Sequence, residues 1–135
     1  MGPMTKSKLQ CLCLVLLACL VAGCGEAIPR LPTQSWADIN VTVETRPPVI
    51  EPGMNEFIVI ASRSTGAVAY DLIVSLRINE GRWYQAIQDG HVGAYRRAIL
   101  VGNPKNDVLF VKIEDDNREG VLRFPLSEQK ISGNQ

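Results

Sequence analysis

Residues 72–81, LIVSLRINEG, contain the pattern that decides the fold. Leu72, Val74 and Leu76 occupy every second position, and the turn-forming Asn-Glu-Gly at 79–81 ends the run. Because side chains alternate between the two faces of a strand, a period of two predicts a strand with one buried face. This stretch therefore predicts a β-strand that contributes one face to a core.

The same period recurs on both sides of that stretch. Ile39, Val41 and Val43 in residues 39–44, INVTVE, form a second expected core face. The uniformly apolar residues 57–61, FIVIA, predict a strand buried on both faces. Further strands are predicted at residues 82–87, 94–101, 108–113 and 121–126, each bounded by turn-forming residues.

Seven short strands with no helical stripe of useful length predict an all-β fold, an immunoglobulin-like antiparallel β-sandwich. We expect this domain to cover residues 36–127 and to be followed by a flexible tail at 128–135. Residues 24–35 include two prolines and show little periodicity, so they predict a tether with a reach of roughly 20 Å.

The N-terminal residues 1–23 have the composition of a secretory signal. Lys6 and Lys8 precede the apolar residues 11–22, and no acidic residue occurs in the segment. A retained transmembrane anchor is the alternative, but twelve apolar residues fall short of the roughly 20 that span a bilayer as a helix.

Val21, Ala22, Gly23 and Cys24 follow the apolar run and resemble the bacterial lipobox. The resemblance implies that signal cleavage follows Gly23 and that Cys24 receives a diacylglyceryl group; ordinary secretion is the alternative. Two or three acyl chains would anchor the protein firmly in a membrane. Gly25, rather than Asp, after the cysteine favours the outer membrane facing the periplasm, by the sorting rule of enteric bacteria.

The mature chain would contain no free thiol, because Cys11, Cys13 and Cys19 leave with the signal and Cys24 is alkylated. Hydrophobic packing without a disulfide must then hold the sheets together. Removal of Lys6 and Lys8 leaves 12 basic and 14 acidic residues. This slightly negative balance argues against nucleic acid as a partner.

Four segments resemble the YtkA-like and FixH-like domains. They are residues 51–59, EPGMNEFIV; residues 66–74, GAVAYDLIV; residues 93–100, which contain Gly-Ala-Tyr and Ala-Ile-Leu; and residues 109–113, LFVKI. Together they span roughly residues 47–126. The resemblance implies an immunoglobulin-like domain outside the cytoplasmic membrane, with relatives linked to copper handling or respiratory oxidase assembly.

Copper chemistry would depend on Met54 and His91, the only methionine and the only histidine of the mature chain. Tight Cu(I) binding needs several soft ligands, so we expect no metal and no cofactor. The Asp-x-Asn-x-Glu-Gly spelling at 115–120 resembles part of a calcium loop. Because Leu126 stands where that loop needs a bidentate acid, we interpret this segment as a hairpin turn.

Aromatic residues and arginines gather around one predicted hairpin. Such side chains dominate protein-binding hot spots, although they are also common in sandwich cores and on exposed strand faces. The possible interaction surface consists of Trp83, Tyr84, Tyr95, Arg96 and Arg97.

Three functions remain open from the sequence. The first is a lipid-anchored, non-catalytic binding or accessory module with a protein partner in the envelope. The second is metal handling or oxidase assembly of the YtkA/FixH-like type, and the third is a structural envelope lipoprotein. We do not expect an enzyme, because a chain with one histidine and no free thiol offers no arguable nucleophile–base pair.

The Cys24→Ser substitution removes the thiol that acylation requires. We expect the variant to accumulate as an unprocessed, unacylated precursor, detectable by its slower gel mobility and its intact mass. Cleavage after Gly23 at the normal rate would instead indicate ordinary secretion.

Overall fold

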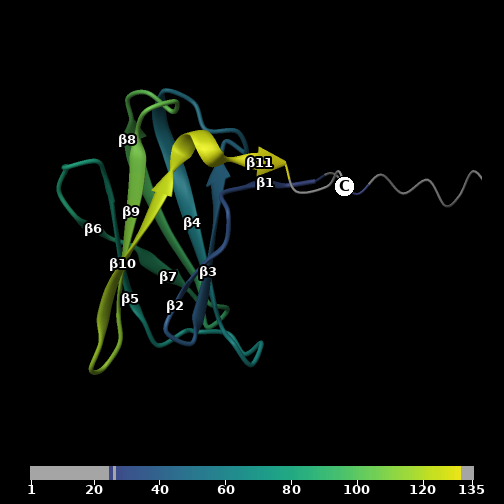
Figure 1. The fold of residues 1–135 in the computed structure, drawn as a ribbon, viewed down its shortest axis with the longest axis vertical. Helices are drawn as coiled ribbons and strands as arrows, with labels where there is room; N and C mark the ends of the chain where they lie inside the picture. The colour runs from purple at the N-terminus through teal and green to yellow at the C-terminus, as the bar shows by residue number, and fades with distance from the viewer. Residues whose placement is uncertain (1–24, 26, 132–135) are drawn as a thin grey trace, which may run out of the picture.

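The computed structural model describes residue 25 and residues 27–131 of the 135-residue chain (Figure 1). The predicted signal segment, Cys24 and residues 132–135 of the predicted tail lie outside the described residues. No helix within the described residues is long and apolar enough to cross a bilayer.

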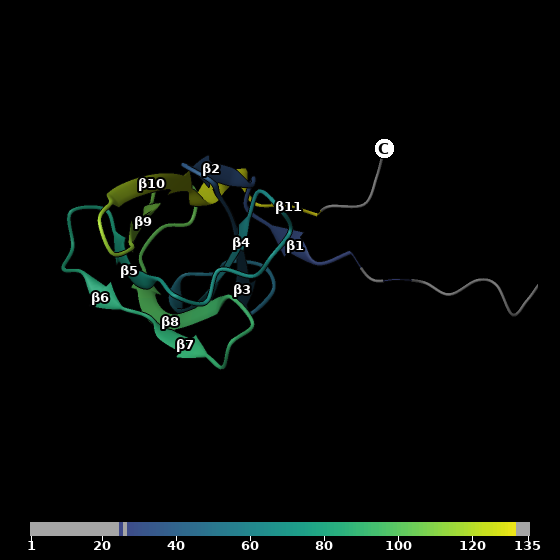
Figure 2. The ribbon, with the colours of Figure 1, turned by 90° about the horizontal axis from the view of Figure 1, so that it is seen from below.

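Two antiparallel sheets pack face to face, which confirms the predicted β-sandwich (Figure 2). The large sheet has the order β11-β1-β3-β4-β8-β7, with β2 also paired to β3, and the small sheet has the order β10-β9-β5-β6. The large sheet contains β1 (Pro29–Arg30), β2 (Gln34–Trp36), β3 (Ile39–Arg46), β4 (Gly53–Arg63), β7 (Ile87–Asp89), β8 (Ala94–Val101) and β11 (Lys130–Ile131). The small sheet contains β5 (Ile73–Ile78), β6 (Tyr84–Gln85), β9 (Val108–Glu114) and β10 (Glu119–Pro125), and a short 3-10 helix, η1 (Leu126–Glu128), follows β10.

The strand order is that of an immunoglobulin-like sandwich. Strands β3, β4, β8 and β7 lie side by side, as strands A, B, E and D do in that fold. Strands β10, β9, β5 and β6 correspond in the same way to G, F, C and C′. The chain therefore alternates between the two sheets in the sequence that this fold requires.

The two predicted core faces are confirmed. Ile39, Val41 and Val43 of β3 are fully buried. On β5, the exposed fraction of Val74 and of Leu76 is no more than 1%. In the run at 57–61, Ile58 on the outer face is buried as well, with an exposed fraction of 6%. In register, Ile58 lies between Glu44 of β3 and Arg96 of β8, so long charged side chains flank it on the outer face.

Asn55, part of the segment that resembles the YtkA-like and FixH-like domains, has a structural role. Its amide nitrogen donates to the carbonyl oxygens of Glu51 (2.7 Å) and Gly53 (3.0 Å), and its carbonyl oxygen accepts from the Glu51 amide. Gly53 has a φ of 111°, which disfavours any residue with a Cβ. These bonds satisfy a buried polar side chain while fixing the entry into β4.

The sandwich extends beyond the predicted boundaries of residues 36 and 127. Strand β1 pairs with both β3 and β11, and β2 pairs with β3, so much of the predicted tether and part of the predicted tail belong to the large sheet. Leu31 is 2% exposed, and its amide donates to the Val43 carbonyl oxygen. Strands of two or three residues next to prolines carry no periodic signal, so the sequence predicts a tether where the structure has β1 and β2.

Strand β2 closes one side of the sandwich against β10. The Gln34 side-chain amide donates to the carbonyl oxygen of Arg123 at 2.5 Å. The Trp36 ring lies on Gly120, where an added Cβ would approach the indole nitrogen to 1.9 Å. A glycine at this position is therefore what allows the tryptophan to bridge the two sheets.

Truncation of Leu76 to alanine tests the core assignment. Because Leu76 is fully buried, we expect Leu76→Ala to lower the free energy of unfolding by about 2–5 kcal/mol, measured by urea denaturation of the mature chain. The matched control is Ile73→Ala on the same strand, where the side chain is 51% exposed and the expected change is within about 0.5 kcal/mol. Equal effects of the two substitutions would contradict the packing described.

Candidate interaction surface

The five residues predicted to form one interaction surface occupy three different environments. Trp83 and Tyr84 are half-buried at the β5–β6 edge of the small sheet, and Arg97 reaches Tyr84 from β8. Tyr95 is buried in the core, and Arg96 lies on the outer face of the large sheet. The structure therefore brings Trp83, Tyr84 and Arg97 to one edge, separates Arg96 from them, and leaves Tyr95 no exposed surface with which to take part.

A first group of side chains, the Trp83 cluster, lies on the outer face of the small sheet. The Arg77 guanidinium carbon lies 4.6 Å from the centre of the Trp83 ring and 5.1 Å from that of Phe110, so the arginine is held against two aromatic rings. The Lys112 ammonium lies 5.2 Å from the Trp83 ring. Such cation–π contacts hold the charged groups in place on the surface.

Burial makes Arg77 an unusual member of this cluster. Its Nε is buried and has no hydrogen-bond partner among the described residues. A buried donor without a partner is destabilising by about 1–3 kcal/mol, and the guanidinium has further donors in a fixed planar arrangement. The Trp83 cluster thus contains guanidinium N–H groups of Arg77 that have no hydrogen-bond acceptor among the described residues.

A second group, the Tyr84 cluster, forms where the two sheets meet. Arg82 follows the β5–β6 turn and lies 4.8 Å from the Tyr84 ring centre, and Arg97 lies 5.1 Å from the same ring. Arg97 shares the inward face of β8 with Tyr95 and Ile99, because residues two apart on a strand point to the same side. The Tyr84 ring consequently contacts one arginine from the β5–β6 connection and one from β8 of the large sheet.

The arginines of the two clusters have aromatic partners and no carboxylate partner. Among the described residues, Arg77, Arg82 and Arg97 form no ion pair, and neither does Arg123, an exposed residue of β10. Five other arginines do form ion pairs: Arg30, Arg46, Arg63, Arg96 and Arg118. Lys112 has one long contact, 3.9 Å from Glu114. The β5–β6 edge is therefore locally positive, although Glu80 lies in the adjacent turn and the whole chain has no net charge.

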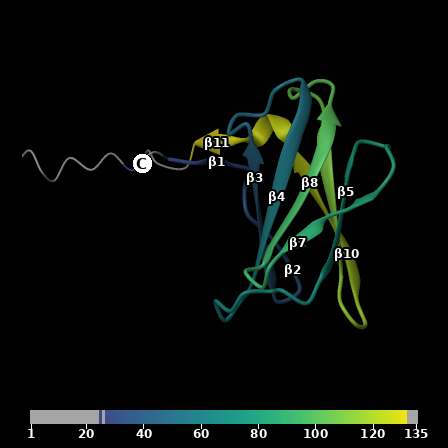
Figure 3. The same cartoon turned by 180° about the vertical axis from the view of Figure 1, so that it is seen from behind.

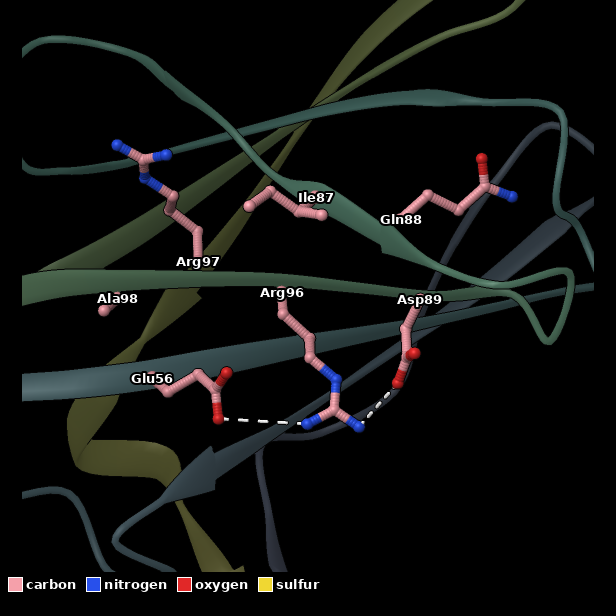
Figure 4. Close-up of a pocket in the computed structure, with 7 residues that line it drawn as sticks. All are labelled: Glu56, Ile87, Gln88, Asp89, Arg96, Arg97 and Ala98. Carbon is pink, nitrogen blue, oxygen red and sulfur yellow. Dashed lines mark ion pairs between the residues drawn. The ribbon is translucent and has the colours of Figure 1, made fainter.

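Arg96 belongs to a separate ion-pair network. Its guanidinium lies 2.7 Å from the Asp89 carboxylate and 4.0 Å from that of Glu56 (Figure 4). A shallow groove of about 700 Å³ surrounds this network, lined by Glu56, Ile87, Gln88, Asp89, Arg96, Arg97 and Ala98. Because both carboxylates face Arg96, its charge is largely compensated within the chain.

Tyr95 connects β8 with the segment between β4 and β5 from inside the core. Its side chain is 1% exposed, and its hydroxyl donates to the Ala69 carbonyl oxygen at 2.8 Å and accepts from the Leu72 amide at 3.2 Å. Burial raises the pKa of Tyr95. This tyrosine positions the 69–72 segment and has no surface available for a partner.

The two candidate copper ligands lie at opposite ends of the large sheet. Met54 pairs with Leu100 near one end of β8, and His91 precedes Ala94 at the other end, so roughly 20 Å of strand separates them. The His91 ring contacts Tyr70 edge-on, with 5.4 Å between ring centres. No cluster of three or more histidine, cysteine or acidic side chains with metal-binding geometry occurs among residues 25 and 27–131.

The Asp115 segment forms the β9–β10 hairpin turn that the sequence analysis favoured. Asp115 accepts hydrogen bonds from the Asn117 and Arg118 amides and from the Arg118 side chain. The Arg118 hydrogen bond is the main cause that lowers the pKa of Asp115. The carboxylate therefore stabilises the turn.

Sequence reasoning missed Arg77, Arg82, Phe110 and Lys112. A usable signal was present for three of them, since the period of two that buries Val74 and Leu76 on β5 and Val111 and Ile113 on β9 places Arg77, Phe110 and Lys112 on the outer face. Their convergence on Trp83 depends on the pairing of β5 with β9, which aligns Arg77 with Phe110.

Comparisons with protein-family models, with curated proteins and with solved structures gave no match for this chain.

The Tyr95→Phe substitution separates the structural role of Tyr95 from a binding role. Loss of the hydroxyl leaves the Ala69 carbonyl and the Leu72 amide unpaired, so we expect a decrease of about 1–3 kcal/mol in the free energy of unfolding. Tyr70→Phe, at a side chain that is 49% exposed, is the control and should leave thermal stability nearly unchanged. Unaltered stability in Tyr95→Phe would argue against the described hydrogen bonds.

Proposed function

We propose that the chain is a lipid-anchored lipoprotein of the bacterial envelope whose sandwich is a non-catalytic binding module for a protein partner. The observation that carries this proposal is the group of three arginines without ion pairs, Arg77, Arg82 and Arg97, held against aromatic rings at one edge of the domain. Tryptophan, tyrosine and arginine are the residues enriched in binding hot spots.

Preorganisation supports a binding role for this edge. A free arginine side chain loses considerable rotamer entropy when it is fixed by a partner. Stacking on Trp83, Phe110 and Tyr84 restricts the guanidinium groups before any partner arrives. A partner would then lose less free energy in ordering the contact.

The position of this edge relative to the N-terminus also supports the proposal. Strand β1 lies near one edge of the large sheet and β7 at the other, and β6 lies at the edge of the small sheet next to β7 (Figure 2). If Cys24 is acylated, only residues 25–28 separate the lipid from β1, a maximum of about 14 Å when extended. The β1–β11 edge would face the membrane, and the Trp83 and Tyr84 clusters would face away from it.

Metal handling, the alternative function, gains no support from the separation of Met54 and His91 along β8. Gly25 after the expected lipid attachment site favours the periplasmic face of the outer membrane, as the sorting rule implies.

Affinity capture from the native envelope tests the binding module. The full-length, tagged lipoprotein is crosslinked in cells, and co-purified proteins are compared by quantitative mass spectrometry between wild type, Trp83→Ala and Arg77→Gln. We expect each substitution to reduce recovery of the partner by about tenfold or more, the effect of losing a hot-spot side chain.

Control substitutions distinguish a binding defect from unfolding. Tyr70→Ala and Lys105→Gln remove an exposed aromatic residue and an exposed cation elsewhere on the domain and should leave recovery unchanged. Melting temperatures should be nearly the same for all four variants. Undiminished recovery with both Trp83→Ala and Arg77→Gln would refute this surface as the binding site.

A further inference from the structure

Strand β8 has an edge that is only partly covered. All eight of its residues pair with β4, but pairing with β7 is restricted to residues 94–96. Along residues 97–101, no described strand pairs with β8 on the side opposite β4, although β5 of the small sheet contacts β8. Figure 3 shows β7 beside only the lower part of β8.

The path of the chain before β7 explains this opening. Tyr84 and Gln85 pair with β5 in the small sheet, and the Ala86 amide donates to the Val74 carbonyl oxygen at 2.8 Å. The chain can therefore join the large sheet only from Ile87 onward. The register Ile87↔Arg96 then sets the last residue of β8 that β7 can cover.

A groove of about 370 Å³ follows the uncovered part of β8. Four consecutive β8 residues form one wall, and the end of β5 with the β5–β6 connection forms the other. Ile78, Arg82 and Tyr84 face residues 97–100 across the groove. The Tyr84 cluster thus lies directly beside the open strand edge.

The open edge has little of the usual protection against pairing with another chain. Edge strands are commonly blocked by prolines, bulges, several charged side chains or inward-pointing charges. Residues 97–101, RAILV, contain no proline and one charged residue, the inward-facing Arg97 that stacks on Tyr84, and Leu100 is 65% exposed. In an antiparallel strand, alternate residues direct their amide and carbonyl groups to one side, so two or three residues of this stretch present these groups to the groove.

We infer that this edge binds an extended, acidic segment of the partner protein as an added strand of the large sheet; the inference rests on the proposed binding function. Backbone hydrogen bonds from 97–101 would supply the pairing, as in other cases of strand addition. A segment of about five residues would cover the stretch, which is roughly 17 Å long. Carboxylates on it would reach Arg82 and Arg97, for which the described residues provide no ion pair.

Defined peptides test the inference on the full-length lipidated protein in neutral detergent. The probe is a fluorescent hexapeptide, Glu-Val-Glu-Val-Glu-Val, and binding is followed by anisotropy. Two control peptides replace Glu by Lys or carry N-methyl groups on alternate amides, which blocks one edge of the strand. We expect binding of the acidic probe to be at least tenfold tighter than that of either control and to weaken as salt rises.

Substitutions and amide exchange locate the bound peptide. Arg82→Gln combined with Arg97→Gln should weaken binding about tenfold, whereas Lys105→Gln should have no effect. Amide hydrogens within residues 97–101 should gain protection when the acidic peptide binds. Absence of binding, equal binding of the N-methylated peptide, or unchanged exchange would overturn the inference. Protection of the same amides without peptide, together with dimerisation, would show that a second copy occupies the edge and would also overturn it.

A photo-crosslinking residue at Leu100 separates this inference from the proposed function. In the native envelope, the Leu100 position should crosslink to the protein captured through the Trp83 cluster, whereas Val121 on β10 should not. Capture that depends on Trp83 without a Leu100 crosslink would reject strand addition and leave the binding function standing. Capture that is insensitive to the Trp83 and Arg77 substitutions would reject the proposed surface itself.

Discussion

The hydrogen bond from the Ala86 amide to the Val74 carbonyl oxygen fixes where the chain leaves the small sheet. Because β6 must end there, β7 enters the large sheet late and covers only residues 94–96 of β8. The same crossing places Tyr84 beside the gap between the sheets, within reach of Arg97 from β8. The open edge of β8 and the contact between Arg97 and the Tyr84 ring are therefore consequences of one backbone constraint.

Different contacts connect the two sheets along the two long sides of the sandwich. On one side, Trp36 packs on Gly120 and Gln34 bonds to β10, so residues near the N-terminus connect the sheets. On the other side, Arg97 and Tyr84 meet between the sheets through a cation–π contact, and no described strand covers residues 97–101. If Cys24 carries the proposed lipid, the closed side lies near the anchor and the open side away from it, an arrangement that suits a tethered module presenting one edge to a partner.

Much of the fold could be predicted because its signal is local. Alternation identified the core faces of β3 and β5, and the strand order follows from the immunoglobulin-like topology. Strands β1 and β11 could not be predicted, since two paired residues leave no periodic trace. At the candidate site, adjacent positions such as Trp83 and Tyr84 point to different sides, so nearness in sequence predicted one surface where the structure has two clusters.

The net charge of the chain likewise does not show where its charged groups are placed. Asp38 contacts both Arg63 and Arg118, and hydrogen bonding to Arg63 is the main cause that lowers the pKa of Asp38. Carboxylates and arginines thus neutralise one another at the end of the domain that contains the β9–β10 turn.

The arginines of the Trp83 and Tyr84 clusters are held by aromatic rings, which fix a guanidinium without cancelling its charge. A chain without net positive charge can therefore bind carboxylates at one edge. A chain without net charge provides no long-range attraction for a long polyanion, because that attraction depends on the field of the whole domain. Local attraction without overall attraction favours a short acidic segment of a protein over nucleic acid or another extended polyanion.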